Sequence, residues 1–89
     1  MVVYKIIYTK NALKYKENLK RSGLNLKVKM LIDILKNNPY QNPPPYEKLE
    51  NNLKGLFSRR INLKHRLVYE IFEEQKIIKI LSLWPRYEF

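Results

Sequence analysis

Along this chain of 89 residues, some segments are rich in β-branched and aromatic residues, as strands are, and others repeat apolar residues at helical spacing. The β-branched and aromatic runs predict four strands. The first strand covers residues 2–8 (VVYKIIY), which include one lysine. Three more lie at residues 55–61, 65–72 and 76–84, and Glu73-Glu74-Gln75 form the turn before the last. Because short connections join antiparallel neighbours, we expect these three strands to form a meander.

Between the first and second strands, apolar residues recur at helical spacing. Residues 12–19 carry apolar side chains that predict one helix, capped by Thr9 or Asn11 and ended by Ser22-Gly23. A second set of apolar residues starts at Leu24 and recurs 4, 7, 8 and 11 positions later. This spacing indicates an amphipathic helix, which should end before Pro39.

The order of elements is therefore β-α-α-β-β-β, which predicts one α+β domain over residues 1–89. We expect a small, mostly antiparallel sheet with both N-terminal helices packed on one face. Arg66, Val68 and Glu70 alternate with larger apolar residues, so the other face should be polar and open.

The composition excludes several classes of function. The chain has no cysteine, one histidine (His65) and one aspartate (Asp33), so a disulfide framework, a zinc site or a Ser-His-Asp triad is very hard to assemble. No apolar run is long enough to span a membrane, and Lys5 interrupts the only stretch that could resemble a signal peptide. We expect a cytoplasmic protein without a metal or a cofactor.

The net charge of +10 favours a polyanionic partner, of which nucleic acid is the commonest. An acidic protein, a membrane surface or a merely solubilising set of lysines are the alternatives. Lysines dominate the first half of the chain, whereas four of the five arginines lie in the second half: Arg59, Arg60, Arg66 and Arg86. Because the arginine fork fits phosphate, we expect the second half to bind the phosphate.

One irregular segment, residues 38–48 (NPYQNPPPYEK), separates the helices from the last strands. Its three consecutive prolines should be extended, left-handed and stiff, and should hold Tyr46 and Glu47 in a defined position. RNA can be cut without a metal if a base, a cation and an acid meet at one phosphate. Glu47, partly buried beside an aromatic ring, is the candidate base, and a loop carboxylate paired with a lysine is its plainer interpretation.

The arginines and Tyr87 each allow a structural as well as a functional interpretation. Arg66 lies in mid-strand, where it faces either a cleft or an ion-pair partner such as Glu70. Arg59 and Arg60 are adjacent, so they point to opposite sides of a strand and at most one enters a shared site. Tyr87, after the last strand, either stacks on a base or packs as an ordinary aromatic.

Glu47, residues 53–61 (LKGLFSRRI) and residues 65–69 (HRLVY) fit one motif set, and residues 84–87 follow as its ending. In these motifs the chain resembles the YoeB/Txe family of bacterial toxin endoribonucleases, within the RelE superfamily. The resemblance implies a microbial RNase-like fold. It also implies a toxin that enters the ribosomal A site and cleaves the translated mRNA without a metal, thereby inhibiting translation.

By position, the resemblance implies that Glu47 is the general base, Arg66 the transition-state arginine and Arg60 a supporting cation. Arg86 stands where the family has its general-acid histidine, and Tyr87 matches the terminal tyrosine. Arginine stays protonated near neutral pH and is a poor proton donor. Protonation of the leaving oxygen would then fall to Tyr87, to water or to a ribosomal group.

The resemblance also implies partners. They are an acidic antitoxin of the YefM/Phd type, the ribosome and its mRNA, and operator DNA through the antitoxin, with a homodimer left open. Lys54, Arg59 and Arg60 are the expected RNA contacts. Two alternatives stay open: a weakened relative that acts as an antitoxin-binding and repressor-accessory module, and an RNA-binding domain without chemistry.

Overall fold

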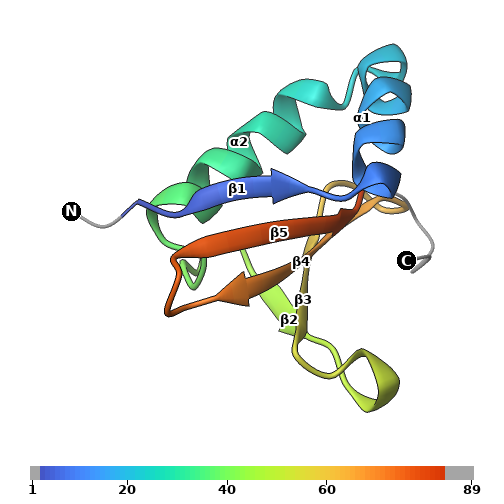
Figure 1. Cartoon of the computed structure of the whole chain (residues 1–89). Helices are drawn as coiled ribbons and strands as arrows, with labels where there is room; N and C mark the ends of the chain where they lie inside the picture. Colours follow the sequence, from blue (N-terminus) through green and yellow to red (C-terminus); the bar gives the residue numbers. More distant parts are fainter. Residues whose placement is uncertain (1–2, 84–89) are drawn as a thin grey trace.

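The computed structural model describes residues 3–83 and shows two helices over one face of a five-stranded sheet (Figure 1). The strands are β1 (Lys5–Tyr8), β2 (Tyr46–Lys48), β3 (Leu56–Arg60), β4 (Arg66–Phe72) and β5 (Ile77–Ser82). Their order in the sheet is β1-β5-β4-β3-β2, with β1 parallel to β5 and every other pair antiparallel. The α+β class and the meander are therefore confirmed.

The two helices, α1 (Lys10–Ser22) and α2 (Asn25–Asn37), begin and end close to the predicted residues. Thr9 caps α1, because its Oγ1 accepts a hydrogen bond from the backbone N–H of Ala12 at 3.2 Å. Gly23 ends the helix with φ +78°, a left-handed conformation that glycine adopts without steric cost. No helix in residues 3–83 has both the length and the apolar character that a bilayer-crossing segment needs.

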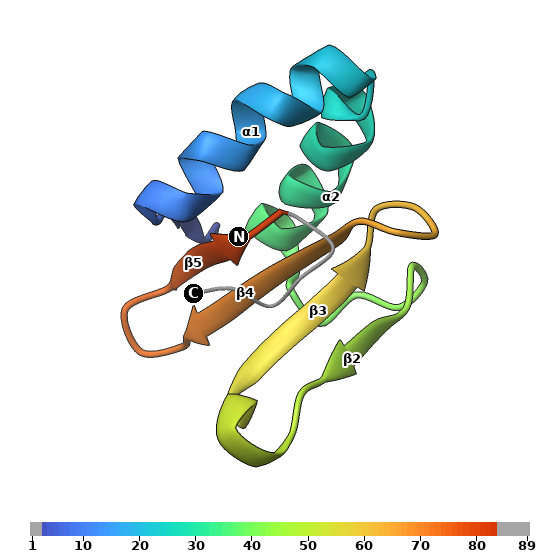
Figure 2. The same cartoon turned by 90° about the vertical axis from the view of Figure 1, so that its right-hand side faces the viewer.

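The hydrophobic core lies between the helices and the sheet. From α2, Leu31 and Leu35 are fully buried, and from the sheet Leu67, Ile78 and Ile80 meet them. Both helices lie towards the β1 and β5 end of the sheet, so the β2 and β3 end extends beyond them (Figure 2). This end of the sheet is where the candidate site residues are found.

The structure corrects the sequence interpretation of residues 38–48. Their last part forms the edge strand β2, with Glu47 opposite Ser58, where we expected no strand. The prolines are not a regular left-handed helix either, since the Asn42–Pro43 and Pro43–Pro44 peptide bonds are cis. Three residues after a run of prolines show no alternating pattern, so the pairing with β3 defines this strand.

The sheet face away from the helices is not open along its whole length, contrary to expectation. Ser58, Val68 and Ser82 face each other across β3, β4 and β5, and none is more than 3% exposed. The β2 side of this face is hollowed by a pocket that charged residues line.

Candidate active site

A pocket of about 220 Å³ opens at the β2 edge of the sheet. We call it the arginine pocket, and its lining residues are Pro45, Tyr46, Glu47, Ser58, Arg60 and Arg66. Three residues that the sequence singled out, Glu47, Arg60 and Arg66, therefore share one pocket. They come from three different strands.

Strand register explains why these side chains meet. Glu47 pairs with Ser58, and Arg60 pairs with Arg66. Side chains at paired positions point to the same face, and so do residues two apart on one strand. Ser58 and Arg60 are two apart, so all four side chains share the face away from the helices. The sequence prediction did not include Ser58, although its alternation with Arg59 would have indicated this side.

The two arginines give the pocket its electrostatic character. Arg60 and Arg66 are directly opposite each other on adjacent strands, an arrangement of like charges that destabilises a sheet. Within residues 3–83, no carboxylate lies within ion-pairing distance of either guanidinium, and the ion pairs present are Lys20–Glu17 and Lys76–Glu73. A bound phosphate would offset the repulsion, since its oxygens match the arginine fork.

Glu47 adds one negative charge beside the two guanidinium groups. Its side chain is exposed, where we expected partial burial. In the described part of the chain, Glu47 forms neither the lysine pair nor any other ion pair that would correspond to its plainer interpretation. The alternative interpretation of Arg66, an ion pair with Glu70, is likewise not among the ion pairs of residues 3–83. The carboxylate is accessible to a ligand in the pocket.

Arg59 corrects a prediction. We expected it to contact RNA, but its side chain is 1% exposed and its guanidinium is hydrogen-bonded inside the protein. Its position on the helix side of β3, opposite to Arg60, is the reason. The sequence correctly limited the pair to one member in a shared site and left open which member that is.

The other predicted residues do not join the arginine pocket. Lys54 lines a separate hollow beyond the other end of β3, together with Glu50 and Gly55. Arg86 and Tyr87 lie outside the described residues. His65 is half-buried, with its Nδ1 3.1 Å from Oδ1 of Asn62, and does not line the pocket.

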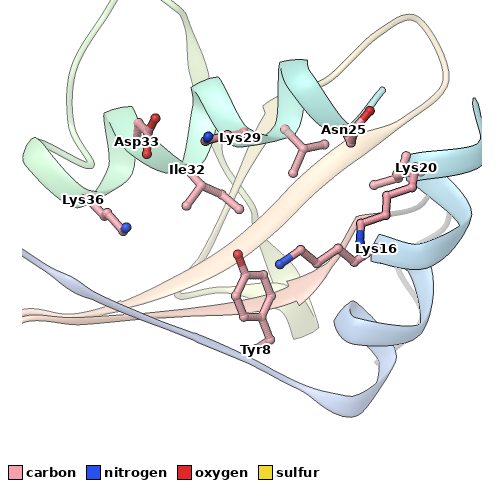
Figure 3. Close-up of a pocket in the computed structure, with 10 residues that line it drawn as sticks. Tyr8, Lys16, Lys20, Asn25, Lys29, Ile32, Asp33 and Lys36 are labelled. Atoms are coloured by element: carbon pink, nitrogen blue, oxygen red, sulfur yellow. The ribbon is translucent and has the colours of Figure 1, made fainter. Parts of the chain in front are cut away.

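A second groove of about 340 Å³ lies between α1, α2 and β1 (Figure 3). We call it the helix groove, and its lining residues are Tyr8, Lys16, Leu19, Lys20, Asn25, Val28, Lys29, Ile32, Asp33 and Lys36. Lys16 extends from α1 towards β1, with its ammonium 4.7 Å from the centre of the Tyr8 ring. Burial raises the pKa of that tyrosine above its ordinary value. Four lysines and one aspartate leave the groove positively charged, over a floor of buried apolar side chains.

Neither site has the composition of a metal centre. Within residues 3–83, no three His, Asp or Glu side chains gather where they could hold a metal ion. The donors of the arginine pocket are guanidinium groups, which are phosphate ligands rather than metal ligands.

Comparison with known proteins shows similarity to one family of toxins. Residues 8–87 match the family described as the YoeB-like toxin of bacterial type II toxin–antitoxin systems. A curated relative, Toxin YoeB of Synechocystis sp., is 38% identical over 52 residues, which are 58% of this chain and 60% of the relative. The match thus spans less than two thirds of the length of the curated relatives.

Solved structures resemble the chain over nearly its whole length. The YoeB/ParE toxin from Agrobacterium tumefaciens has a TM-score of 0.84 and 25% identity, covering 93% of this chain and 99% of its own. The toxin in the heterotetrameric YoeB–YefM complex from Staphylococcus aureus has a TM-score of 0.80 and 30% identity, covering 94% and 98%. The expected fold family is thereby confirmed.

Proposed function

Because the chain belongs to the YoeB-like toxin family of bacterial type II toxin–antitoxin systems, we propose that it is an endoribonuclease that cleaves mRNA in the ribosomal A site and so inhibits translation. The observation that carries the proposal is the arginine pocket. Arg60 and Arg66 stand directly opposite each other without a carboxylate partner in the described residues, and Glu47 lines the same cavity. Two guanidinium groups and one carboxylate suit a phosphodiester with a 2′-hydroxyl beside it.

In the proposed reaction, Glu47 accepts the proton of the 2′-hydroxyl group as a general base. The 2′-oxygen attacks the phosphorus, and the bond from phosphorus to the 5′-oxygen breaks. Arg66 and Arg60 stabilise the negative charge that grows on the non-bridging oxygens. The leaving 5′-oxygen takes up a proton, so the products are a 2′,3′-cyclic phosphate and a 5′-hydroxyl.

The proton for the leaving oxygen has three candidate sources in this proposal: Tyr87, water and a ribosomal group. Arg86 stabilises charge instead, because a guanidinium rarely releases its proton. A positioned acid contributes about 10²–10⁴-fold, so a chain that relies on water would be correspondingly slower.

The proposal includes an antitoxin as partner. Staphylococcus aureus YoeB is solved in complex with YefM, and we extend such an assembly to this chain. The helix groove suits an acidic amphipathic segment of the antitoxin. Apolar side chains of that segment would enter the groove between Leu19 and Ile32, while its carboxylates meet the lysines at the rim. Operator DNA would be reached through the antitoxin alone.

Primer extension on a message translated in a purified system tests the nuclease proposal. Glu47→Gln and Arg66→Ala should each lower cleavage by about 100-fold or more, because each removes a group that acts at the transition state. Glu50→Gln is the matched control, since Glu50 is an exposed carboxylate outside the arginine pocket. Wild-type cleavage by both folded variants would refute the assigned site. Binding of RNA without any cut product would favour a non-catalytic module.

A further inference from the structure

Arg59 is a buried arginine that binds a loop. Its Nη1 donates to the carbonyl oxygen of Pro44 at 2.6 Å, and its Nη2 donates to those of Pro39 and Gln41, each at 2.9 Å. Its Nε donates to the hydroxyl of Tyr69 at 3.1 Å. The guanidinium thus connects three carbonyls of residues 39–44 to the sheet.

This cation is buried among neutral acceptors. A buried charge costs free energy unless strong hydrogen bonds compensate it, and no carboxylate in the described residues pairs with Arg59. Burial raises the pKa of Tyr69 to about 12, so its hydroxyl stays neutral and accepts through a lone pair. The buried guanidinium fixes the geometry of the loop in exchange, because one planar group with five donors can bind carbonyls that approach from several directions.

The bound loop leads straight into the strand that carries Glu47. Residues 39–44 precede β2, and Arg59 is the cross-strand partner of Tyr46, the first residue of β2. The guanidinium carbon also lies 5.0 Å from the centre of the Tyr46 ring. Arg59 therefore contacts both the approach to β2 and its first side chain, one residue from the carboxylate in the arginine pocket.

The strand β2 needs such support. It has three residues, lies at the sheet edge and, among the strands of residues 3–83, pairs with β3 alone. Strands are usually five or six residues long, and one this short holds its register weakly by backbone hydrogen bonds alone. A displacement of about 1 Å in a reacting group can lower a rate by about 100-fold.

We propose that Arg59 is a positioning residue, whose buried guanidinium sets residues 39–46 so that Glu47 faces Arg66 across the arginine pocket. The inference rests on the proposed function of Glu47 as the general base. Arg59 itself touches no substrate, since it lies on the other side of β3 from the pocket. Lysine could not replace it, because one ammonium on a flexible stem cannot reach all three carbonyls in fixed directions.

The experiment compares Arg59→Lys with the wild type in cleavage of a translated message, at a temperature where thermal melts show both to be folded. The kcat should fall by about 10- to 100-fold, with KM changed less than about threefold, because the base is misplaced while the two RNA-binding arginines remain. Amide resonances of Gln41, Tyr46 and Glu47 should shift in the NMR spectrum. Ile78→Val, a core change on β5 opposite Ile6 of β1 and in the lining of neither the arginine pocket nor the helix groove, should lower stability and leave kcat unchanged.

A double-mutant comparison separates positioning from mere stabilisation. In a Glu47→Gln background, Arg59→Lys should lower cleavage by less than about twofold, since the misplaced group is already inactive. An equal loss in both backgrounds, or a loss that follows the unfolded fraction, would overturn the inference. Wild-type kcat in Arg59→Lys would do the same. Normal cleavage by Glu47→Gln alone would instead refute the proposed function of Glu47. In that case the NMR spectrum still tests Arg59, and unshifted amide resonances at residues 41–47 in Arg59→Lys would refute its role in holding the loop.

Discussion

Neighbouring residues in one strand have opposite roles in this protein. Arg59 is buried and holds a loop, whereas Arg60 is exposed and lines the arginine pocket. Because side chains alternate along a strand, the sequence predicts that the two arginines point to opposite faces of the sheet. Which of the two faces the interior depends on where the helices pack, and no property of two identical side chains can reveal it.

Glu73 provides a residue-scale prediction about pH. Its carboxylate accepts hydrogen bonds from Lys76 at 2.9 Å and from the Tyr4 hydroxyl at 2.8 Å, and these bonds hold its pKa below the ordinary 4.5. A lowered pKa in the folded state stabilises the fold above pH 4.5, and the contribution is lost as pH falls through the folded value. Glu73→Gln should therefore melt below the wild type at pH 7, and the gap should close in acid.

Thermal melts between pH 3 and pH 7, roughly the span over which a carboxyl group titrates, provide the measurement. Glu74→Gln is the matched control, because Glu74 is an exposed neighbour without these hydrogen bonds among the described residues. A gap that stays constant across the pH range would contradict the assigned cause.

Among the elements, the helices and the three long strands could be predicted, and β2 could not. Long segments repeat their pattern several times, so a helical or a strand period is visible in them. The strand β2 has three residues, Tyr46–Lys48, and exists because β3 offers it a partner. The candidate base lies on this strand, so its surroundings were also the least predictable part of the site.

The start of α1 provides an element-scale prediction. Thr9 Oγ1 accepts from the N–H of Ala12 and also donates to the carbonyl oxygen of Leu81, each at 3.2 Å, so one hydroxyl caps the helix and joins it to the β5 strand. Thr9→Ala should lower the free energy of unfolding by about 1–2 kcal/mol. Thr9→Ser keeps the hydroxyl and should lose far less. Denaturant melts measure both, and equal losses would exclude the hydroxyl as the cause.

On the scale of the whole molecule, two charged surfaces lie at opposite edges of one sheet. The arginine pocket is at the β2 edge, and the helix groove adjoins β1 at the other edge. They share no lining residue. If the two proposed roles are correct, RNA cleavage at the arginine pocket and antitoxin binding at the helix groove should be separable by substitution.

Lys29→Glu combined with Lys36→Glu tests this separation. Charge reversal in the helix groove should weaken antitoxin binding by about tenfold or more, since like charges would meet across the interface. The matched control is Lys14→Glu with Lys27→Glu, which makes the same change of charge at exposed positions outside the groove. Calorimetry measures the affinity, and mRNA cleavage should change equally in both double variants. Equal loss of affinity in both would rule out the groove as the docking surface.

The sequence by itself determined the class of fold, the net charge and the kinds of side chain available for chemistry, because hydrophobic period, composition and motif are local properties of a chain. Tertiary structure decided the rest. It made Glu47 part of a strand, brought Arg60 opposite Arg66 and buried Arg59 under the loop. These outcomes depend on strand register and on which face the helices cover. Both follow from contacts between residues far apart in the chain, which no local pattern encodes.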